Sequence, residues 1–164
     1  MSMERLWAGW RMAYVGTVGA EVPHTECLMC GLAAAPPEDA GVVARDDRAF
    51  AVLNAYPYTS GHLMVAPLAH ESELEALDAD DAAALMEMTR RAAAALKKAY
   101  APDGINVGMN LGRAAGAGVP DHLHVHVVPR WVGDTNFMTT VAEARVLPEA
   151  LPETLDRLRD AWPS

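Results

Sequence analysis

The chain has 164 residues, 51% of them hydrophobic, which suits one globular domain with a buried core and is too short for two ordinary domains. Its formal charge of −9, with only 13 lysines and arginines, argues against a nucleic-acid partner, since phosphate backbones are bound mainly by those residues. No apolar run approaches the roughly 18 residues of a membrane span, and charges interrupt the N-terminal segment where a signal peptide would be apolar. The sequence therefore predicts a cytoplasmic protein with no membrane partner, in which backbone N–H groups and imidazoles could still bind a small anionic ligand.

The N-terminal part predicts an arm followed by one domain. Residues 1–23 carry large aromatics among small residues and are expected to pack on the body or on a partner subunit, ahead of a single domain at 24–164. Cys27 and Cys30 are the only cysteines. Their Cys-x-x-Cys spacing alone is compatible with a redox pair, half of a metal site or coincidence. The proline and glycine content of 31–41 predicts turn and loop.

Three short strands are expected next. Val42 and Val43 begin a hairpin that turns at Asp46 and Asp47 and continues in the apolar strand 50–53. The segment GHLMVAP, residues 61–67, is the third strand, closed by its proline.

The clearest helix is expected within residues 70–100. Its apolar residues follow a period of 3.6, acidic residues cluster at its start, and two lysines lie at its end, as the helix dipole favours. The acidic run 78–81 is interpreted as a helix cap rather than a metal site. A shorter helical turn is expected over 71–77.

Two more strands and a tail complete the pattern. INVGMNL (105–111) is the fourth strand, GRAAGAG (112–118) a flexible loop, HLHVHVV (122–128) the fifth strand, and 148–162 a helical tail. Together these elements predict an α+β fold, with an antiparallel sheet of about five strands, one long helix and a C-terminal helical tail.

Three histidines alternate along the fifth predicted strand. Side chains alternate between faces on a strand, so His122, His124 and His126 are expected to share one face while apolar neighbours face the core. Such a row could bind a catalytic metal, or one histidine could act as a nucleophile toward phosphorus. The second interpretation is favoured, because the glycine-rich segment 108–118 suits a phosphate and only Asp121 lies nearby to complete a hydrolytic metal site.

These motifs resemble those of the histidine triad (HIT) family of nucleotide hydrolases and transferases. HLHVHVV is similar to that family's His-x-His-x-His-x-x signature. GHLMVAPLAH is similar to its second landmark, and Asn54 stands eight residues before His62, as in the family. The resemblance covers roughly residues 27–131 and implies a HIT-like fold, a homodimer and an adenine-type nucleotide or dinucleoside polyphosphate as substrate.

The resemblance also implies roles for individual residues. His124 would attack the α-phosphorus and form a nucleotidyl-histidine, His126 would contact the phosphate and leaving group, and His62 would lie beside the triad. The implied nucleotide-binding residues are Val52, Leu53, Asn54, Ala55, Asn110, Gly116, Ala117, Gly118 and Trp131. In that set Asn54 would bind the ribose hydroxyls. Arg130 and Trp131 fit polyphosphate or base contacts, and equally a packing role. Asn136 and Phe137 are suggested to shape the pocket.

Some members of the family bind a structural zinc, and the matching positions here are Cys27, Cys30, His70 and His122. Two cysteines and two histidines make a closed tetrahedral site with no position for a substrate. The resemblance therefore implies a structural zinc, removes His122 from catalysis and requires no catalytic metal. His24 as a competing ligand and a redox pair of cysteines are the alternatives.

The sequence departs from the family at Gly118, where hydrolytic members usually carry a glutamine. Its absence leaves room for inorganic phosphate as the second acceptor. Several segments are similar to the actinobacterial branch that phosphorolyses diadenosine tetraphosphate to ATP and ADP, although that branch tends to have a hydroxyl residue at this position. The alternatives are a hydrolase of dinucleoside polyphosphates or nucleoside phosphoramidates, and a non-catalytic nucleotide-binding protein.

Overall fold

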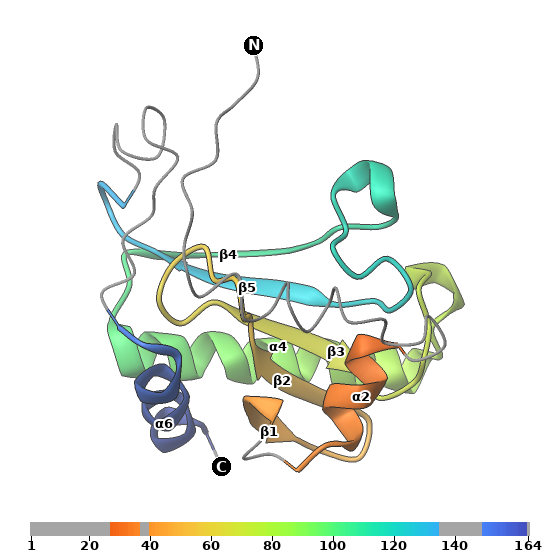
Figure 1. Ribbon diagram of the computed structural model, residues 1–164, viewed down its shortest axis with the longest axis horizontal. Coiled ribbons are helices and arrows are strands. Elements are labelled where there is room, and N and C mark those ends of the chain that lie inside the picture. Colours follow the sequence, from red (N-terminus) through yellow and green to blue (C-terminus); the bar gives the residue numbers. More distant parts are fainter. Residues whose placement is uncertain (1–26, 37–39, 135–148, 164) are drawn as a thin grey trace, which may run out of the picture.

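The computed structural model describes residues 27–36, 40–134 and 149–163 (Figure 1). The predicted arm at 1–23, His24, Asn136 and Phe137 lie outside these residues. Within the described part, five strands form one antiparallel sheet in the order β1-β2-β3-β5-β4. The strands are β1 (Val42–Arg45), β2 (Ala49–Leu53), β3 (Leu63–Pro67), β4 (Gly104–Met109) and β5 (Val125–Arg130). The predicted α+β class and five-stranded antiparallel sheet are confirmed.

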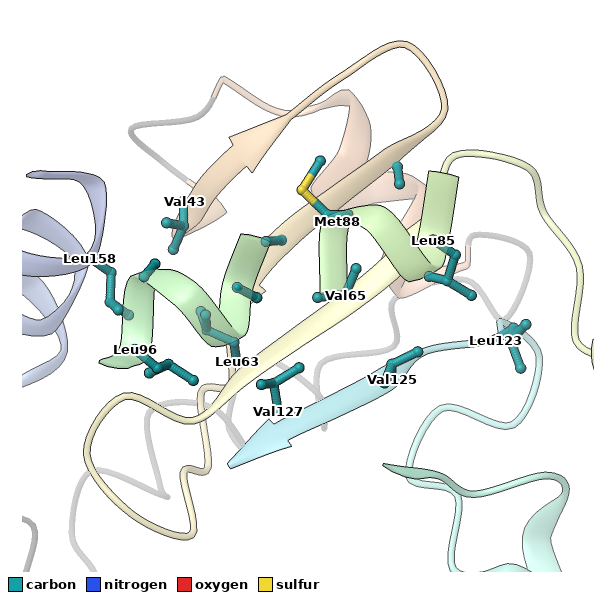
Figure 2. Close-up of a cluster of buried hydrophobic side chains, with 14 residues drawn as sticks. Val43, Leu63, Val65, Leu85, Met88, Leu96, Leu123, Val125, Val127 and Leu158 are labelled. Atoms are coloured by element: carbon teal, nitrogen blue, oxygen red, sulfur yellow. The ribbon is translucent and has the colours of Figure 1, made fainter. Parts of the chain in front are cut away.

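The long helix α4 (Ala79–Tyr100) covers one face of the sheet (Figure 1). Its apolar stripe and the inward side chains of the strands form a cluster of fourteen buried residues, drawn in Figure 2. Alternation along β5 sends Val125 and Val127 into this cluster. His126, which lies between them, therefore faces away from α4.

The opposite face carries a second, smaller core under helix α2 (Leu28–Ala34). Met29 of α2 is fully buried in a cluster with Val42, Phe50, Val52 and Ala66. The prediction of loop over 31–41 is therefore wrong at its start, because α2 runs into it. The helix is only seven residues long and has no side-chain N-cap, so packing through Met29 stabilises it more than local signals do.

The remaining elements follow the predictions, with changed boundaries. The short turn is the 3-10 helix η1 (Leu74–Ala76), and the glycine-rich loop contains a second, η2 (Arg113–Ala115). The tail is helix α6 (Leu151–Ala161), and the guanidinium of Arg159 donates to the carbonyl of Val42 at 2.7 Å. No helix in the described ranges is long and apolar enough to span a membrane.

The fifth strand begins later than predicted. β5 starts at Val125, so His122 and His124 precede the strand instead of lying on it. The main chain bends at His122, and its carbonyl oxygen accepts a hydrogen bond from His124 Nδ1 instead of pairing with a neighbouring strand.

Candidate functional site

Three histidines gather on the sheet face opposite α4. His124 lies just before β5, His126 lies on β5 opposite Met64 and Gly108, and His62 immediately precedes β3. The ring centroids of His124 and His126 are 5.0 Å apart, and those of His62 and His126 are 5.1 Å apart. The three residues predicted as catalytic are thus brought together.

The backbone fixes which nitrogen of His124 carries the proton. Its Nδ1 lies 2.9 Å from the carbonyl oxygen of His122, and a carbonyl can only accept, so Nδ1 must be the donor. In neutral His124 the lone pair is therefore on Nε2. A neutral imidazole with a free Nε2 lone pair is a competent nucleophile.

The neutral ring of His62 carries its proton on the other nitrogen, Nε2. The backbone N–H of Tyr58 donates to His62 Nδ1 at 3.1 Å, so this nitrogen is an acceptor and Nε2 carries the proton of the neutral ring. His62 Nε2 lies 3.0 Å from His126 Nδ1, to which it donates. In neutral His126 the proton is then on Nε2, which makes this atom a hydrogen-bond donor toward the site.

Burial affects the protonation of His126. Desolvation lowers the pKa of His126, and the neighbouring His124 lowers it further. The ring is thereby kept neutral at physiological pH, with one donor and one acceptor nitrogen. The partly exposed ring of Tyr58 packs on His62, with centroids 4.6 Å apart.

A second group of side chains can bind a metal ion. One ligand atom from each of Cys27, Cys30, His70 and His122 lies within 4.8 Å of the others. The Sγ of Cys27 is 3.3 Å from His122 Nδ1, and the Sγ of Cys30 is 3.4 Å from His70 Nδ1 and 3.6 Å from His122 Nδ1. A tetrahedral zinc with bonds of about 2.0 to 2.3 Å would space its ligand atoms roughly 3.3 to 3.8 Å apart. The donor set and these three sulfur–nitrogen distances therefore fit zinc.

Hydrogen bonding prepares His122 for this role. Its Nε2 donates to the carbonyl of Pro67 at 2.9 Å, which leaves the lone pair on Nδ1, facing both sulfurs. The cysteine pair begins helix α2, as the cysteines of redox pairs often do. Two imidazoles beside the sulfurs nevertheless match a metal site better than a thiol pair alone.

The predicted base-binding residues are not all brought together. Val52 is 1% exposed and packs under α2, whereas Leu53 packs against the cluster under α4, so their side chains lie on opposite faces. Ala55 is partly exposed in the following loop. Asn54 Oδ1 accepts the N–H of Tyr56 at 2.8 Å, while its Nδ2 lies 3.4 Å from His62 Nε2. Asn54 thus reaches the histidine group.

The predicted phosphate-binding residues lie at the end of the sheet where β5 begins. Met109 pairs with Val125, so continuing this register by one residue brings Asn110 level with His124. The loop that follows contains Gly116, Ala117 and Gly118, and Gly116 has a φ of +92°. Gly116 and Gly118 are exposed, which leaves their backbone accessible to an anion.

Trp131 and Arg130 lie at the other end of β5. A strand rises about 3.3 Å per residue, so roughly 20 Å of chain separates His124 from Trp131. The Trp131 ring packs edge-on against Tyr100, and Arg130 pairs with Asp134 at 2.6 Å and donates to Asn106 at 2.8 Å. This pair therefore makes packing and ion-pair contacts at the end of β5 away from His124, and its predicted contact with the nucleotide stays a prediction.

Sequence reasoning missed the backbone partners that orient the site. These are the N–H of Tyr58, the carbonyl of Pro67 and the carbonyl of Glu71, which accepts the N–H of Leu123 at 2.7 Å. No sequence signal could have identified them, because every residue offers the same backbone groups.

Comparison with known proteins gives consistent matches. The model of the HIT domain family matches residues 36–132. The chain is 42% identical to the AP-4-A phosphorylase of Mycobacterium tuberculosis, over 98% of this chain and 85% of that protein. A zinc-bound histidine triad family protein from Mycobacterium smegmatis is 31% identical, with a TM-score of 0.68 over 83% of this chain and 92% of its own. A hypothetical histidine triad nucleotide-binding protein from Sulfolobus tokodaii is 27% identical, with a TM-score of 0.67 over 82% and 91% of the two chains.

Proposed function

The chain belongs to the histidine triad family and is an enzyme of that family, and on this premise we propose that it cleaves dinucleoside polyphosphates by phosphorolysis. The proposed substrate is diadenosine tetraphosphate, and the proposed products are ATP and ADP. The observation that carries the proposal is the tautomer of His124, whose Nδ1–H is bound to a carbonyl so that Nε2 is available for attack. The similarity to the mycobacterial AP-4-A phosphorylase supports this choice of substrate.

The first step forms a covalent intermediate on His124. Its Nε2 attacks the α-phosphorus, an N–P bond forms, and the bond from that phosphorus to the bridging oxygen breaks. The leaving group is ATP, whose new terminal oxygen is stabilised by the Nε2–H of His126. His62 orients His126 through the hydrogen bond to its Nδ1. In this positively charged phosphoramidate the neutral imidazole of His124 is a good leaving group for the next step.

In the second step inorganic phosphate attacks the same phosphorus. The N–P bond breaks, a new phosphoanhydride forms, and the adenylyl group leaves as ADP with His124 restored. Exposed backbone at Gly116 and Gly118 suits the polyphosphate and the incoming phosphate. Asn110 is proposed to assist there, and Asn54 to bind the ribose.

The test is to incubate the purified protein with diadenosine tetraphosphate, with and without phosphate, and to separate the nucleotides. Phosphate-dependent formation of ATP and ADP, lost in His124→Ala with an unchanged circular dichroism spectrum, is the expected result. Formation of AMP and ATP without phosphate would instead identify a hydrolase. Turnover of a nucleoside phosphoramidate alone would redirect the substrate class, and binding without any turnover would identify a nucleotide-binding protein.

We also propose that the cluster of Cys27, Cys30, His70 and His122 holds a structural zinc. When bound, the ion would join α2 to the segments after β3 and before β5 and would supply no reaction chemistry. Burial and the neighbouring Cys27 raise the pKa of the Cys30 thiol, which favours the neutral thiol unless a cation binds this sulfur. Metal analysis of protein purified without chelator should find one zinc per chain. Freely titrating thiols and no metal would contradict this assignment.

A homodimer formed through β4 is proposed on the exposure of that strand. β4 is an edge strand, and Val107 on it is 51% exposed, whereas at the opposite edge Arg159 binds a carbonyl of β1. Light scattering should give the mass of a dimer for the wild type and of a monomer for Val107→Asp.

We further propose that residues 24–164 form one domain and that 1–23 are an arm. A cytoplasmic location is proposed because reduced thiols persist there.

A further inference from the structure

The nucleophile lies outside the hydrogen-bonded sheet. β5 begins at Val125, so the main chain at His122 and His124 makes no ladder hydrogen bonds, although both side chains are at least 96% buried. Contacts other than the sheet must therefore fix the direction of the His124 ring.

Two hydrogen bonds connect this segment to its surroundings, and a third lies within it. The N–H of Leu123 donates to the carbonyl of Glu71 at 2.7 Å, and His122 Nε2 donates to the carbonyl of Pro67 at 2.9 Å. The third is the bond from His124 Nδ1 to the carbonyl of His122, at 2.9 Å. The first two attach the segment to residues 67–71, and the third attaches the nucleophile to His122.

His122 therefore contacts two sites at once. Its Nδ1 lies 3.3 Å from Cys27 Sγ and 3.6 Å from Cys30 Sγ, while its backbone carbonyl accepts a hydrogen bond from His124 Nδ1. The segment 67–71 contains a further member of the cluster, His70, next to the Glu71 carbonyl that holds Leu123. Each of the two hydrogen bonds that hold residues 122–124 to residues 67–71 therefore involves a member of the cysteine–histidine cluster or a residue next to one.

We infer that the cluster of Cys27, Cys30, His70 and His122 positions the nucleophile, so that an intact metal site holds the His122 carbonyl in line with His124 Nδ1. These four are positioning residues, since they act on the substrate only through His124. Without the metal, or with the two sulfurs joined in a disulfide, His122 loses the partners of its Nδ1. Its carbonyl can then turn away, and His124 can adopt the other tautomer, whose Nε2–H cannot attack phosphorus. This inference rests on the proposed function.

The test follows the tautomer of His124 directly. Protein labelled with ¹⁵N-histidine is studied by two-bond ¹H–¹⁵N spectra, first loaded with zinc, then after chelator and after zinc is restored. The His124 resonances are assigned with His124→Gln. Zinc-loaded protein should show the single tautomer protonated at Nδ1, and chelated protein a mixture of tautomers, reversed by zinc. The double variant Cys27→Ser/Cys30→Ser should show the mixture at all times.

Kinetics supply a second readout. Loss of supporting interactions around a metal ligand typically costs about 10- to 100-fold in activity, and here we expect that loss in kcat with KM changed less than twofold. The matched control is Arg45→Gln. The Arg45 side chain donates to the carbonyls of Leu32 and Ala35, at 3.5 and 3.3 Å, at the end of α2 away from the cysteines. This variant should keep its zinc, the single tautomer and kcat.

An unchanged His124 tautomer and kcat after zinc is removed from folded protein would overturn the inference. A wild type that takes up no zinc would overturn it as well. Should the double variant fail to fold, the chelated and zinc-restored wild type gives the same comparison. A zinc-dependent tautomer in a protein that turns over no dinucleoside polyphosphate would support the positioning role and contradict the proposed function.

Discussion

Gly61 illustrates how a single residue shapes the site. It precedes His62, has a φ of +86°, and its Cα faces the end of α4 so closely that an added Cβ would lie 3.0 Å from both Leu96 and Tyr100. Only glycine combines this backbone conformation with such close packing. The turn that delivers His62 to His126 therefore depends on the absence of a side chain here.

Gly61→Ala should lower the free energy of unfolding by about 1 to 3 kcal/mol, since it adds both backbone strain and overlap. Because any relief moves the adjacent His62, kcat should also fall. Denaturant unfolding and steady-state kinetics measure both effects. Gly104→Ala is the control, because Gly104 has a negative φ and an added Cβ there meets nothing within 4 Å. Equal stability of the two variants would contradict the prediction.

His126 should make stability depend on pH. Burial lowers its pKa in the folded state below the ordinary value of 6.5, so the unfolded chain binds its proton more readily. Its stabilising contribution is fully present above pH 6.5 and is lost as the pH falls toward the lowered value.

Guanidinium unfolding at pH 7.5 and pH 5.5 tests this dependence. The wild type should lose more stability on acidification than His126→Asn, which lacks the titrating group. The same loss in both proteins would show that other groups account for the acid sensitivity.

At the scale of elements, α4 is the helix whose limits are best encoded locally. The side chain of Asp78 accepts the N–H of Asp80 at 2.9 Å, acidic residues occupy the first turn, and Lys97 and Lys98 the last. The predicted helix cap is confirmed. The helix ends at Tyr100: the N–H of Ala101 still donates to the carbonyl of Lys97, but the left-handed conformation of Ala101, at φ 44°, turns the chain out of the helix.

Asp78→Ala should lower the free energy of unfolding by about 1 kcal/mol, through loss of the N-cap acceptor. Asp78→Asn keeps an acceptor oxygen and should cost much less. Denaturant unfolding of both variants distinguishes the cap from a general effect of charge. If both lost the same stability, the charge of Asp78 would be the cause.

At the scale of the whole molecule, helix α6 packs against both α4 and β1. Leu158 is fully buried in the cluster under α4, and Lys98 and Arg159 bind backbone carbonyls across the contact. Tyr100 at the end of α4 hydrogen-bonds to Glu149 ahead of α6, and burial followed by this bond raises its pKa to about 12. The C-terminal helix is thus part of the domain core.

Leu158→Ala should destabilise the protein by about 2 to 5 kcal/mol, since it leaves a cavity between α4, α6 and β1. Leu151→Ala on the same helix, where the side chain is 37% exposed, should cost far less. Thermal unfolding of both variants is the measurement. A similar Tm for the two would mean that α6 contributes little to the core.

Elements fixed by interactions between residues close in sequence were predicted correctly, whereas those that depend on contacts far along the chain were missed or misplaced. α4 and the hairpin of β1 and β2 were predicted because periodicity, caps and turn residues are local. The helix α2 was missed, since only contacts of Met29 with residues far along the chain make it stable. The start of β5 was misplaced because His122 and Leu123 bond to Pro67 and Glu71 instead of a neighbouring strand.

Residue types and their spacing were enough to indicate the fold class, the family resemblance and the chemical character of the site. Which groups meet depends on how the chain folds in three dimensions. The tertiary structure brought His62 to His126 and the cysteine pair to His70 and His122, across separations that no periodicity encodes. It also fixed the proton positions on His124 and His62 through backbone groups, whose partners depend on how the chain folds and not on which side chains it carries.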